Sequence, residues 1–271
     1  MIEARTVLIT GASGGIGRGV CEALAAEARQ TGRPLRLAVH GSRESAALSG
    51  LVCDLAAAGG VEAKPFIADV TDPDACAGLI DRIVAWSARL DAIVSNAGQS
   101  RPGRLASMSV GEWQATLDLN LRATWLLARA AYPALAAVRG AITAVASMSG
   151  LSPHPGYGAY STAKAGLVML CRQLAQEWAG DGIRVNAVCP GMIRTPLTES
   201  VYRDEETRLK REALVPLGRI GTARDIGEAV AFLTGDKASY ITGVALRVDG
   251  GLSEGMLNLI PGRPDKSLQS S

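Results

Sequence analysis

The stretch "TVLITGASGGIGRG" (6–19) decides the expected fold, because a short run of β-forming residues leads through a glycine-rich turn into a helical pattern. Positions without side chains let the backbone turn tightly and approach a pyrophosphate, which binds at the N-terminus of the following helix. A tight turn without a ligand would use glycines too, but the position in the first βαβ unit favours nucleotide binding. The residues expected to face the nucleotide here are Gly11, Ser13, Gly15, Ile16 and Gly17.

The same alternation of a strand pattern with a helical pattern continues along the chain. Further strands are expected at 35–39, 63–69, 91–98, 140–147, 183–191 and 244–251. Helices are expected at about 44–58, 72–88, 110–137, 157–179, 199–213 and 222–234, with Asp72 capping and Pro73 at the first helical position of the second of these. Regular alternation with apolar strands predicts an α/β fold, a doubly wound parallel sheet of about seven strands with helices on both faces. We expect one domain, 1–255, and a partly flexible tail, 256–271.

Composition excludes several classes of protein. The 271 residues are 48% hydrophobic and 20% charged, with a formal net charge of +2, so a large core is expected and no basic footprint for nucleic acid is present. No uncharged apolar run approaches the ~20 residues of a membrane helix. The N-terminus enters a strand pattern at once and does not resemble a signal peptide.

Cysteine and histidine usage points to a reducing compartment. The five cysteines are widely spaced, and no C-x-x-C motif occurs. We therefore expect buried, reduced thiols in a cytoplasmic protein. Only two histidines are present, His40 and His154, so no metal site is expected.

The end of the second strand, "AVHGSRES", bears on the choice of dinucleotide. An acidic residue there would bind a ribose 2′-hydroxyl and favour NAD. This chain instead has His40, Ser42 and Arg43 before the first acid, Glu44. The planar fork of Arg43 suits a 2′-phosphate. Two points weaken the argument: Arg43 could instead be a solvated residue at a helix start, and Gly14 stands where a second basic residue would help. The sequence therefore favours NADP, with NAD as the alternative.

A tyrosine and a lysine, Tyr160 and Lys164, stand four residues apart and so share one helix face. A cation ~4 Å from a phenol contributes ~4 kcal/mol at an effective dielectric of ~20. That lowers a phenol pKa of ~10 by at most ~3, with desolvation opposing the change. Tyr160 is thus a candidate general acid or base, although many such pairs only pack on a surface. Ser147 at a strand end and Asn120 within a helix are further candidates, and Asn120 in a helix interior either serves a site or caps a bend.

These motifs, taken in order, resemble the short-chain dehydrogenase/reductase family. The resemblance covers about residues 5–251 and rests on Thr10-Gly11-x-x-x-Gly15-Ile16-Gly17, Ser95-Asn96-Ala97-Gly98, Asn120, Ser147, Tyr160-x-x-x-Lys164 and Pro190-Gly191. It implies a Rossmann-type fold and an NAD(P)-dependent oxidoreductase that interconverts a ketone and a secondary alcohol. Ser95 departs from the asparagine that the family often has there.

The resemblance also implies a role for each matching residue. Tyr160 would act as general acid or base, Lys164 would hold the nicotinamide ribose, Ser147 would orient the substrate oxygen, and Asn120 would anchor a relay water. Cofactor contacts are implied at Asp69, Val70, Asn96, Ala97, Gly98, Pro190, Gly191, Ile193 and Thr195.

The substrate pocket is expected between the loop 150–158 and the stretch 192–215, a candidate mobile lid. His154, Tyr157 and Met192 are its candidate wall residues, beside Ser147 and Tyr160; His154 is either an extra acid or a solvated loop histidine. The C-terminal pattern also resembles 3-oxoacyl-carrier-protein reductases, but Asp181 stands where those usually have a basic residue. A small ketone, sugar or coenzyme A thioester is therefore favoured over a carrier-protein substrate.

Two other functional classes are weighed against this one. A nucleotide-sugar epimerase needs a longer C-terminal domain, and a non-enzymatic cofactor sensor would tolerate loss of the catalytic set. The resemblance further implies a homotetramer through the helices at about 110–137 and 157–179. The group Met256, Leu257, Leu259 and Ile260 would pack either on a neighbouring subunit or locally.

Overall fold

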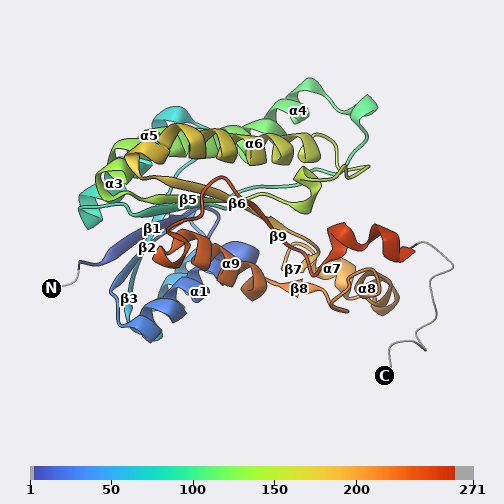
Figure 1. The fold of residues 1–271 in the computed structure, drawn as a ribbon, viewed down its shortest axis with the longest axis horizontal. Helices are drawn as coiled ribbons and strands as arrows, with labels where there is room; N and C mark the ends of the chain where they lie inside the picture. Colours follow the sequence, from blue (N-terminus) through green and yellow to red (C-terminus); the bar gives the residue numbers. More distant parts are fainter. Residues whose placement is uncertain (1–2, 260–271) are drawn as a thin grey trace.

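The computed structural model describes residues 3–259. A seven-stranded parallel sheet runs through its centre in the order β3-β2-β1-β4-β5-β6-β9 (Figure 1). The chain reverses its direction of travel between β1 and β4, so the predicted doubly wound sheet of seven strands is confirmed. The strands are β1 (Arg5–Ile9), β2 (Leu35–Gly41), β3 (Val61–Ile67), β4 (Ala92–Ser95), β5 (Ala141–Val145), β6 (Arg184–Pro190) and β9 (Ala245–Val248).

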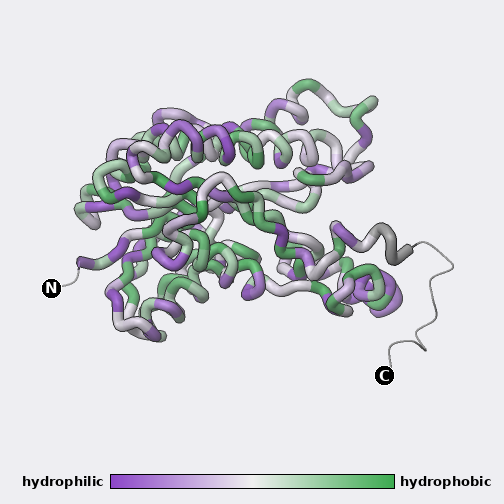
Figure 2. Tube along the Cα trace, in the orientation of Figure 1, coloured by the Kyte–Doolittle hydropathy of each residue, from purple (hydrophilic) through white to green (hydrophobic). Residues whose placement is uncertain are grey.

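Helices cover both faces of the sheet (Figure 1). One face packs against α1 (Gly15–Thr31), α2 (Ala46–Ala57) and α9 (Ala223–Thr234). The other face packs against α3 (Pro73–Ser87), α5 (Ala123–Val138) and α6 (Tyr160–Trp178). Each face has its own apolar core, and Figure 2 shows the hydrophobic colour gathered along the central strands. Strands buried on both sides explain the nearly continuous apolar runs in the sequence.

Beside the main sheet lies a smaller subassembly formed by residues 193–222. It contains β7 (Ile193–Arg194) and β8 (Gly221–Thr222), which pair in parallel, and the short helices α7 (Glu199–Tyr202) and α8 (Glu205–Glu212). The sequence pattern predicts one helix over 199–213. The structure divides it because the carboxylate of Asp204 accepts a hydrogen bond from the Thr207 amide and begins a new helix.

The long helix expected at 110–137 also differs from prediction. It consists of α4 (Val110–Leu117), a π-helical turn at Asp118–Arg122 and then α5. The helix expected from 157 begins instead at Tyr160, because Gly156 and Gly158 adopt left-handed φ angles of 82° and 54°. The predicted cap at Asp72 is confirmed, since its side chain accepts a hydrogen bond from the Ala75 amide.

Two glycines set the position of α1. A Cβ atom at Gly19 would lie 2.4 Å from the Ala223 carbonyl oxygen, and one at Gly227 would lie 2.3 Å from the Gly19 carbonyl oxygen. The backbones of α1 and α9 are therefore in direct contact, which only glycine permits. This contact fixes the direction from which α1 approaches the glycine-rich turn.

Some expectations need correction or fall outside the described residues. Four cysteines are buried as predicted, but Cys53 is exposed because it lies on the solvent side of α2. None of the helices within residues 3–259 is long and apolar enough to cross a membrane. A 3-10 helix, Leu252–Leu259, extends into the predicted tail, and residues 260–271, with Ile260 among them, lie outside the described residues.

Candidate active site

The glycine-rich turn is held against the end of β4 by four hydrogen bonds. The Thr10 hydroxyl oxygen accepts from the amides of Asn96 and Ala97, each at 3.0 Å. The Asn96 side-chain amide donates to the carbonyl oxygens of Thr10 and Gly11, at 3.0 and 3.1 Å. Asn96 therefore shapes the turn with its amide nitrogen while it also lines the cavity described below.

The turn has the shape that a pyrophosphate requires. Gly11 and Gly15 have left-handed φ angles of 61° and 50°, and a Cβ atom at Gly17 would lie 2.2 Å from the Gly11 carbonyl oxygen. The first turn of α1 contains no acidic residue, and Gly14 at its N-cap offers no capping side chain. The free amides at this helix end thus remain available for an anion, and the residues present fit a dinucleotide.

The residues after β2 divide into buried and exposed groups. His40 is 1% exposed, donates from Nε2 to the Ala68 carbonyl oxygen at 3.0 Å and accepts from the Gly11 amide at Nδ1. Burial lowers its pKa, so the ring is neutral and positions the turn from behind the cavity wall. Ser42 and Arg43 are exposed, and no ion pair holds Arg43 within residues 3–259.

Further along this edge, β3 is followed by the predicted adenine contacts. The Asp69 carboxylate accepts hydrogen bonds from the hydroxyl and the amide of Thr71, which hold its pKa below the usual value. Val70 is buried. Asp69 is thus an ionised group fixed in one orientation.

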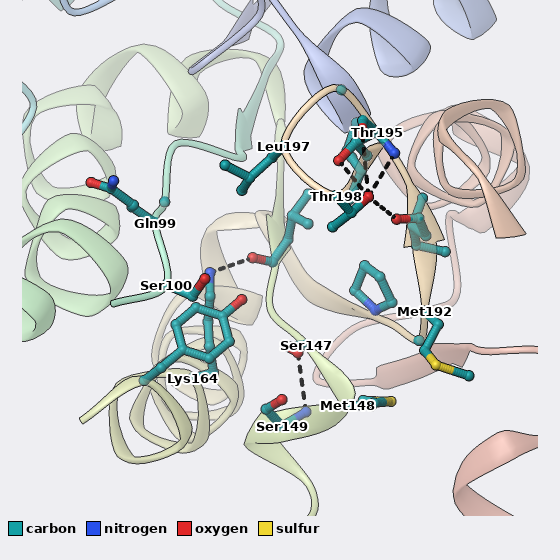
Figure 3. A pocket seen from close by; sticks show the side chains of 18 of the residues that line it. Gln99, Ser100, Ser147, Met148, Ser149, Lys164, Met192, Thr195, Leu197 and Thr198 are labelled. Atoms are coloured by element: carbon teal, nitrogen blue, oxygen red, sulfur yellow. Dashed lines mark hydrogen bonds between the residues drawn. The ribbon is translucent and has the colours of Figure 1, made fainter. Parts of the chain in front are cut away.

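The predicted tyrosine, lysine and serine line one cavity of about 680 Å³, which the glycine-rich turn also lines. Tyr160 is the first residue of α6, Lys164 follows one turn later, and Ser147 comes directly after the strand β5 and its neighbour Ala146. Lys164 is 3% exposed; its Nζ donates to the Val145 carbonyl oxygen at 2.9 Å and lies 5.7 Å from the centre of the Tyr160 ring (Figure 3). The hydroxyl of Ser147 accepts from the Ser149 amide.

The protonation of this set differs from the sequence-based expectation. Burial raises the pKa of Tyr160, interaction with the Ser147 hydroxyl partly offsets the rise, and Tyr157 adds to it. Burial also lowers the pKa of Lys164 from 10.5 to about 8. The expected fall in the phenol pKa beside Lys164 is therefore wrong for the protein alone, because desolvation disfavours both charged forms.

The π-helical turn explains the asparagine within the long helix. Asn120 is 1% exposed, donates to the carbonyl oxygens of Gln99 and Thr116 at 2.9 and 3.0 Å, and accepts from the Gln99 amide at 3.2 Å. A Cβ atom at Gly98 would lie 2.8 Å from Asn120 Oδ1 and 3.3 Å from Lys164 Nζ. Asn120 thus lies in a helix irregularity close to Lys164 but is not part of the cavity lining, and its role in the site stays a prediction.

The end of β6 and the residues after it form another part of the cavity lining. A Cβ atom at Gly191 would lie 2.5 Å from the Asp249 Cβ, so the close approach to the segment after β9 requires glycine. Thr198 accepts from the Thr195 amide at 2.9 Å and donates to the Ile193 carbonyl oxygen at 2.8 Å (Figure 3). Pro190, Ile193 and Thr195 line the cavity as the resemblance implies.

Aromatic side chains form the far wall. The His154 ring stacks on Tyr157 with centroids 3.7 Å apart, and Tyr157 lies 6.5 Å from the ring of Tyr160. His154 is half-buried, and a 2.9 Å hydrogen bond between its Nδ1 and the Ser149 hydroxyl holds the ring in place. Met192 completes the set of substrate-side candidates that line the cavity.

Sequence reasoning named other wall residues only as parts of ranges or not at all. After β4 the predicted contacts are Asn96, Ala97 and Gly98, and after β5 the predicted site residue is Ser147. Within the predicted lid, 192–215, individual roles are predicted for Met192, Ile193 and Thr195 alone. The lining residues without a predicted role of their own are Gly14, Gln99, Ser100, Val145, Ala146, Met148, Ser149, Pro196, Leu197, Thr198, Tyr202, Arg211 and Leu214. The position of Gln99 and Ser100 directly after "SNAG" was the one available signal.

A parallel sheet with a glycine cradle at its switch point and a tyrosine–lysine pair beside that cradle define a dinucleotide-dependent oxidoreductase. The family model described as "Enoyl-(Acyl carrier protein) reductase" matches residues 11–253. The chain therefore belongs to the short-chain dehydrogenase/reductase family and is an NAD(P)-dependent oxidoreductase.

Relatives of known name or structure agree with this family. The Escherichia coli 3-oxoacyl-[acyl-carrier-protein] reductase FabG is 37% identical over 251 residues, which are 92% of this chain and 98% of FabG. A protein from Sinorhizobium meliloti, assigned as a short-chain alcohol dehydrogenase, has a TM-score of 0.84 at 32% identity, covering 92% of this chain and 96% of that one. A Beutenbergia cavernae protein, assigned as an NAD(P)-dependent gluconate 5-dehydrogenase and solved with bound NADP, has a TM-score of 0.83 at 33% identity, covering 93% and 97%.

Proposed function

We propose that the protein interconverts a ketone and a secondary alcohol on a small-molecule substrate, with Tyr160 as general acid and base. One observation carries the proposal: Tyr160, Ser147 and Lys164 line the same cavity as the glycine-rich turn. A substrate carbonyl in this cavity meets a hydroxyl that donates a proton and a second hydroxyl that orients it. The bound dinucleotide supplies or accepts the hydride.

Each residue of the set has a distinct task in this scheme. In reduction, the Tyr160 hydroxyl donates its proton to the substrate oxygen as negative charge develops there, and Ser147 donates a second hydrogen bond. Burial keeps Tyr160 protonated and therefore ready to act as an acid. Lys164 donates one hydrogen bond to the Val145 carbonyl oxygen, and its remaining N–H groups can bind ribose hydroxyls. Asn120 fixes the loop at Gln99 beside Lys164 and is a positioning residue.

NADP is the dinucleotide that the structure favours. Arg43 is exposed after β2, where no acidic residue precedes Glu44. A guanidinium without a protein carboxylate suits a 2′-phosphate. The Beutenbergia cavernae relative was solved with NADP, which supports the same preference, and NAD stays the alternative.

A 3-oxoacyl thioester is the second candidate substrate, because curated relatives are named 3-oxoacyl-[acyl-carrier-protein] reductases. Asp181 argues for the small-molecule substrate. Asp181 lies just after α6, at the position where the resemblance leads one to expect a basic residue that binds an acidic carrier protein. Its carboxylate accepts a 2.8 Å hydrogen bond from the Tyr132 hydroxyl on α5.

We also propose a homotetramer that associates through α5 and α6. Trp125 on α5 and Met169 on α6 are 42% and 58% exposed, large apolar side chains of the kind that interfaces cover. Light scattering of the wild-type protein and of a Trp125→Glu variant tests this assembly.

The unpaired thiols support the proposed cytoplasmic location. The proposed catalytic domain spans 1–255, and the proposed tail spans 256–271.

The test of the proposed function is an absorbance assay at the nicotinamide band, with NADPH and NADH, over ketones, sugars, and acetoacetyl-coenzyme A. Consumption of NADPH with a ketone supports the proposal. Dinucleotide binding without turnover on any of these substrates contradicts it and favours a cofactor-sensing protein.

A further inference from the structure

We propose that Arg211 on α8 binds a carboxylate of the substrate, so that the reaction acts on oxo acids and their hydroxy acids. The inference rests on the proposed function, because it names the substrate class of the same cavity. It concerns a residue that neither the family motifs nor the sequence pattern single out.

The charges that line the cavity are all positive. Of the residues described, the lining contains two cations, Lys164 and Arg211, and neither an aspartate nor a glutamate. Lys164 lies beside Tyr160 and is directed toward Val145. Arg211 therefore supplies the charge at the part of the cavity formed by the lid residues. A cationic substrate is disfavoured there and an anionic one is favoured.

The neighbours of Arg211 leave its guanidinium available. The carboxylates on α7 and α8 are engaged elsewhere: Glu199 pairs with Arg194, Glu205 and Glu212 pair with Arg208, Glu206 pairs with Lys210, and Asp204 caps α8. Arg211 instead lies over the Tyr202 ring, 5.6 Å from its centre, and Tyr202 is 4% exposed. A buried ring fixes the plane of a guanidinium, and a fixed planar fork suits a carboxylate.

Arg211 and the proton donor come from different elements of the cavity lining, Arg211 from α8 and Tyr160 from the start of α6. Tyr160 is followed by Tyr157 and then by His154, whose ring stacks on Tyr157. Arg211 lines the same cavity as His154 and Tyr157. Burial lowers the pKa of His154, and the charge of Arg211 lowers it further. Both effects disfavour the charged form of His154, so Arg211 is the cation of this lining that carries its charge independently of the histidine. A carbonyl at Tyr160 and a carboxylate at Arg211 lie along one aromatic wall.

The experiment compares matched acids and esters on the protein loaded with NADP⁺ or assayed with NADPH. The probes are acetoacetate and levulinate, their methyl esters, and acetoacetyl-coenzyme A. The variants are Arg211→Gln and Arg211→Lys. Lys210→Gln is the matched control, because it removes one cation from the adjacent, 73%-exposed position. Calorimetry measures acid binding, and initial rates measure kcat/KM.

We expect Arg211→Gln to weaken binding and kcat/KM for the acids by about 10- to 100-fold, the usual effect of losing a charge-assisted hydrogen bond. The methyl esters should change by less than about threefold, Arg211→Lys should restore part of the loss, and Lys210→Gln should behave as wild type. The inference is overturned by equal losses for acid and ester or by unchanged values for the acids. A loss confined to acetoacetyl-coenzyme A overturns it too and would assign Arg211 to a coenzyme phosphate.

The two proposals fail in different ways. If the wild-type protein reduces neither the acids nor the esters while Arg211→Gln still weakens binding of the acids, the proposed reaction fails and the carboxylate site stands. A parallel loss of NADP⁺ affinity in Arg211→Gln would assign the residue to the dinucleotide and overturn the carboxylate site.

Discussion

Lys164 Nζ lies 5.7 Å from the centre of the Tyr160 ring, and its hydrogen bond within the protein goes to the Val145 carbonyl oxygen. Lys164 is buried and Tyr160 is half-buried, and desolvation disfavours the phenolate and the ammonium alike. The fold thus presents a protonated hydroxyl and an amine that titrates near neutrality in one cavity. This state suits a proton donor that must return to its starting form after each turnover.

Replacing Tyr160 by phenylalanine removes the proton donor and leaves the cavity wall intact. We expect turnover of the reduced ketone to fall by about 100- to 10,000-fold, the usual contribution of a general acid. Dinucleotide affinity should change by less than about threefold, because the phenol acts on the substrate oxygen. Steady-state rates and a fluorescence titration with NADPH measure the two quantities.

The control for this variant is Tyr240→Phe, since Tyr240 is fully exposed and distant from the cavity lining. It should keep wild-type turnover. Near-native turnover in Tyr160→Phe would remove the general-acid assignment, and an equal loss in both variants would point to damage to the fold.

The lowered pKa of Lys164 predicts a dependence of stability on pH. The folded pKa is about 8 and the ordinary value is 10.5, so between these limits the unfolded chain binds more protons than the folded protein. Stability therefore rises with pH through this window, and below pH ~8 the buried ammonium costs about 3 kcal/mol relative to the neutral amine. We expect the free energy of unfolding of wild type, minus that of Lys164→Met, to increase from pH 8 to 10.5. Urea denaturation without dinucleotide measures it, and parallel curves for the two proteins would show that Lys164 is not perturbed.

The geometry of the glycine-rich turn predicts that Gly14 tolerates substitution by alanine and that Gly17 does not. A Cβ atom at Gly17 would lie 2.2 Å from a backbone oxygen, whereas one at Gly14 would meet nothing within 4 Å, and Gly14 has an extended φ of −157°. We expect Gly17→Ala to destabilise the protein by about 2 kcal/mol or more and to abolish NADPH binding, and Gly14→Ala to change stability by less than about 0.5 kcal/mol. Thermal unfolding compares the variants, and similar melting temperatures would contradict the cradle.

The sheet and its helices followed from the sequence because strand, turn and cap signals are local. The strand "TVLIT", the glycines that follow it and the Asp72 cap can each be predicted from a few consecutive residues. The π-helical turn at Asn120 was not predictable, because it depends on hydrogen bonds to Gln99, 21 residues away. The pKa shift of Tyr160 runs opposite to the expected direction, since sequence spacing gives the tyrosine–lysine pair but not how strongly burial acts on the phenol. Arg211 could not be singled out from the sequence, because the ion pairs along α8 decide which of its cations remains available to bind a substrate.

The position of Arg43 after β2 predicts the preference between dinucleotides. We expect Arg43→Ala to raise the KM for NADPH by about tenfold and to leave the KM for NADH within about twofold, because only NADPH carries the 2′-phosphate. Arg29→Ala is the matched control: Arg29 is exposed in the last turn of α1, at the end opposite the glycine-rich turn. Initial-rate measurements with both dinucleotides decide the question. Equal effects of Arg43→Ala on NADPH and NADH would show that Arg43 does not read the phosphate, and a wild-type preference for NADH would reverse the assignment.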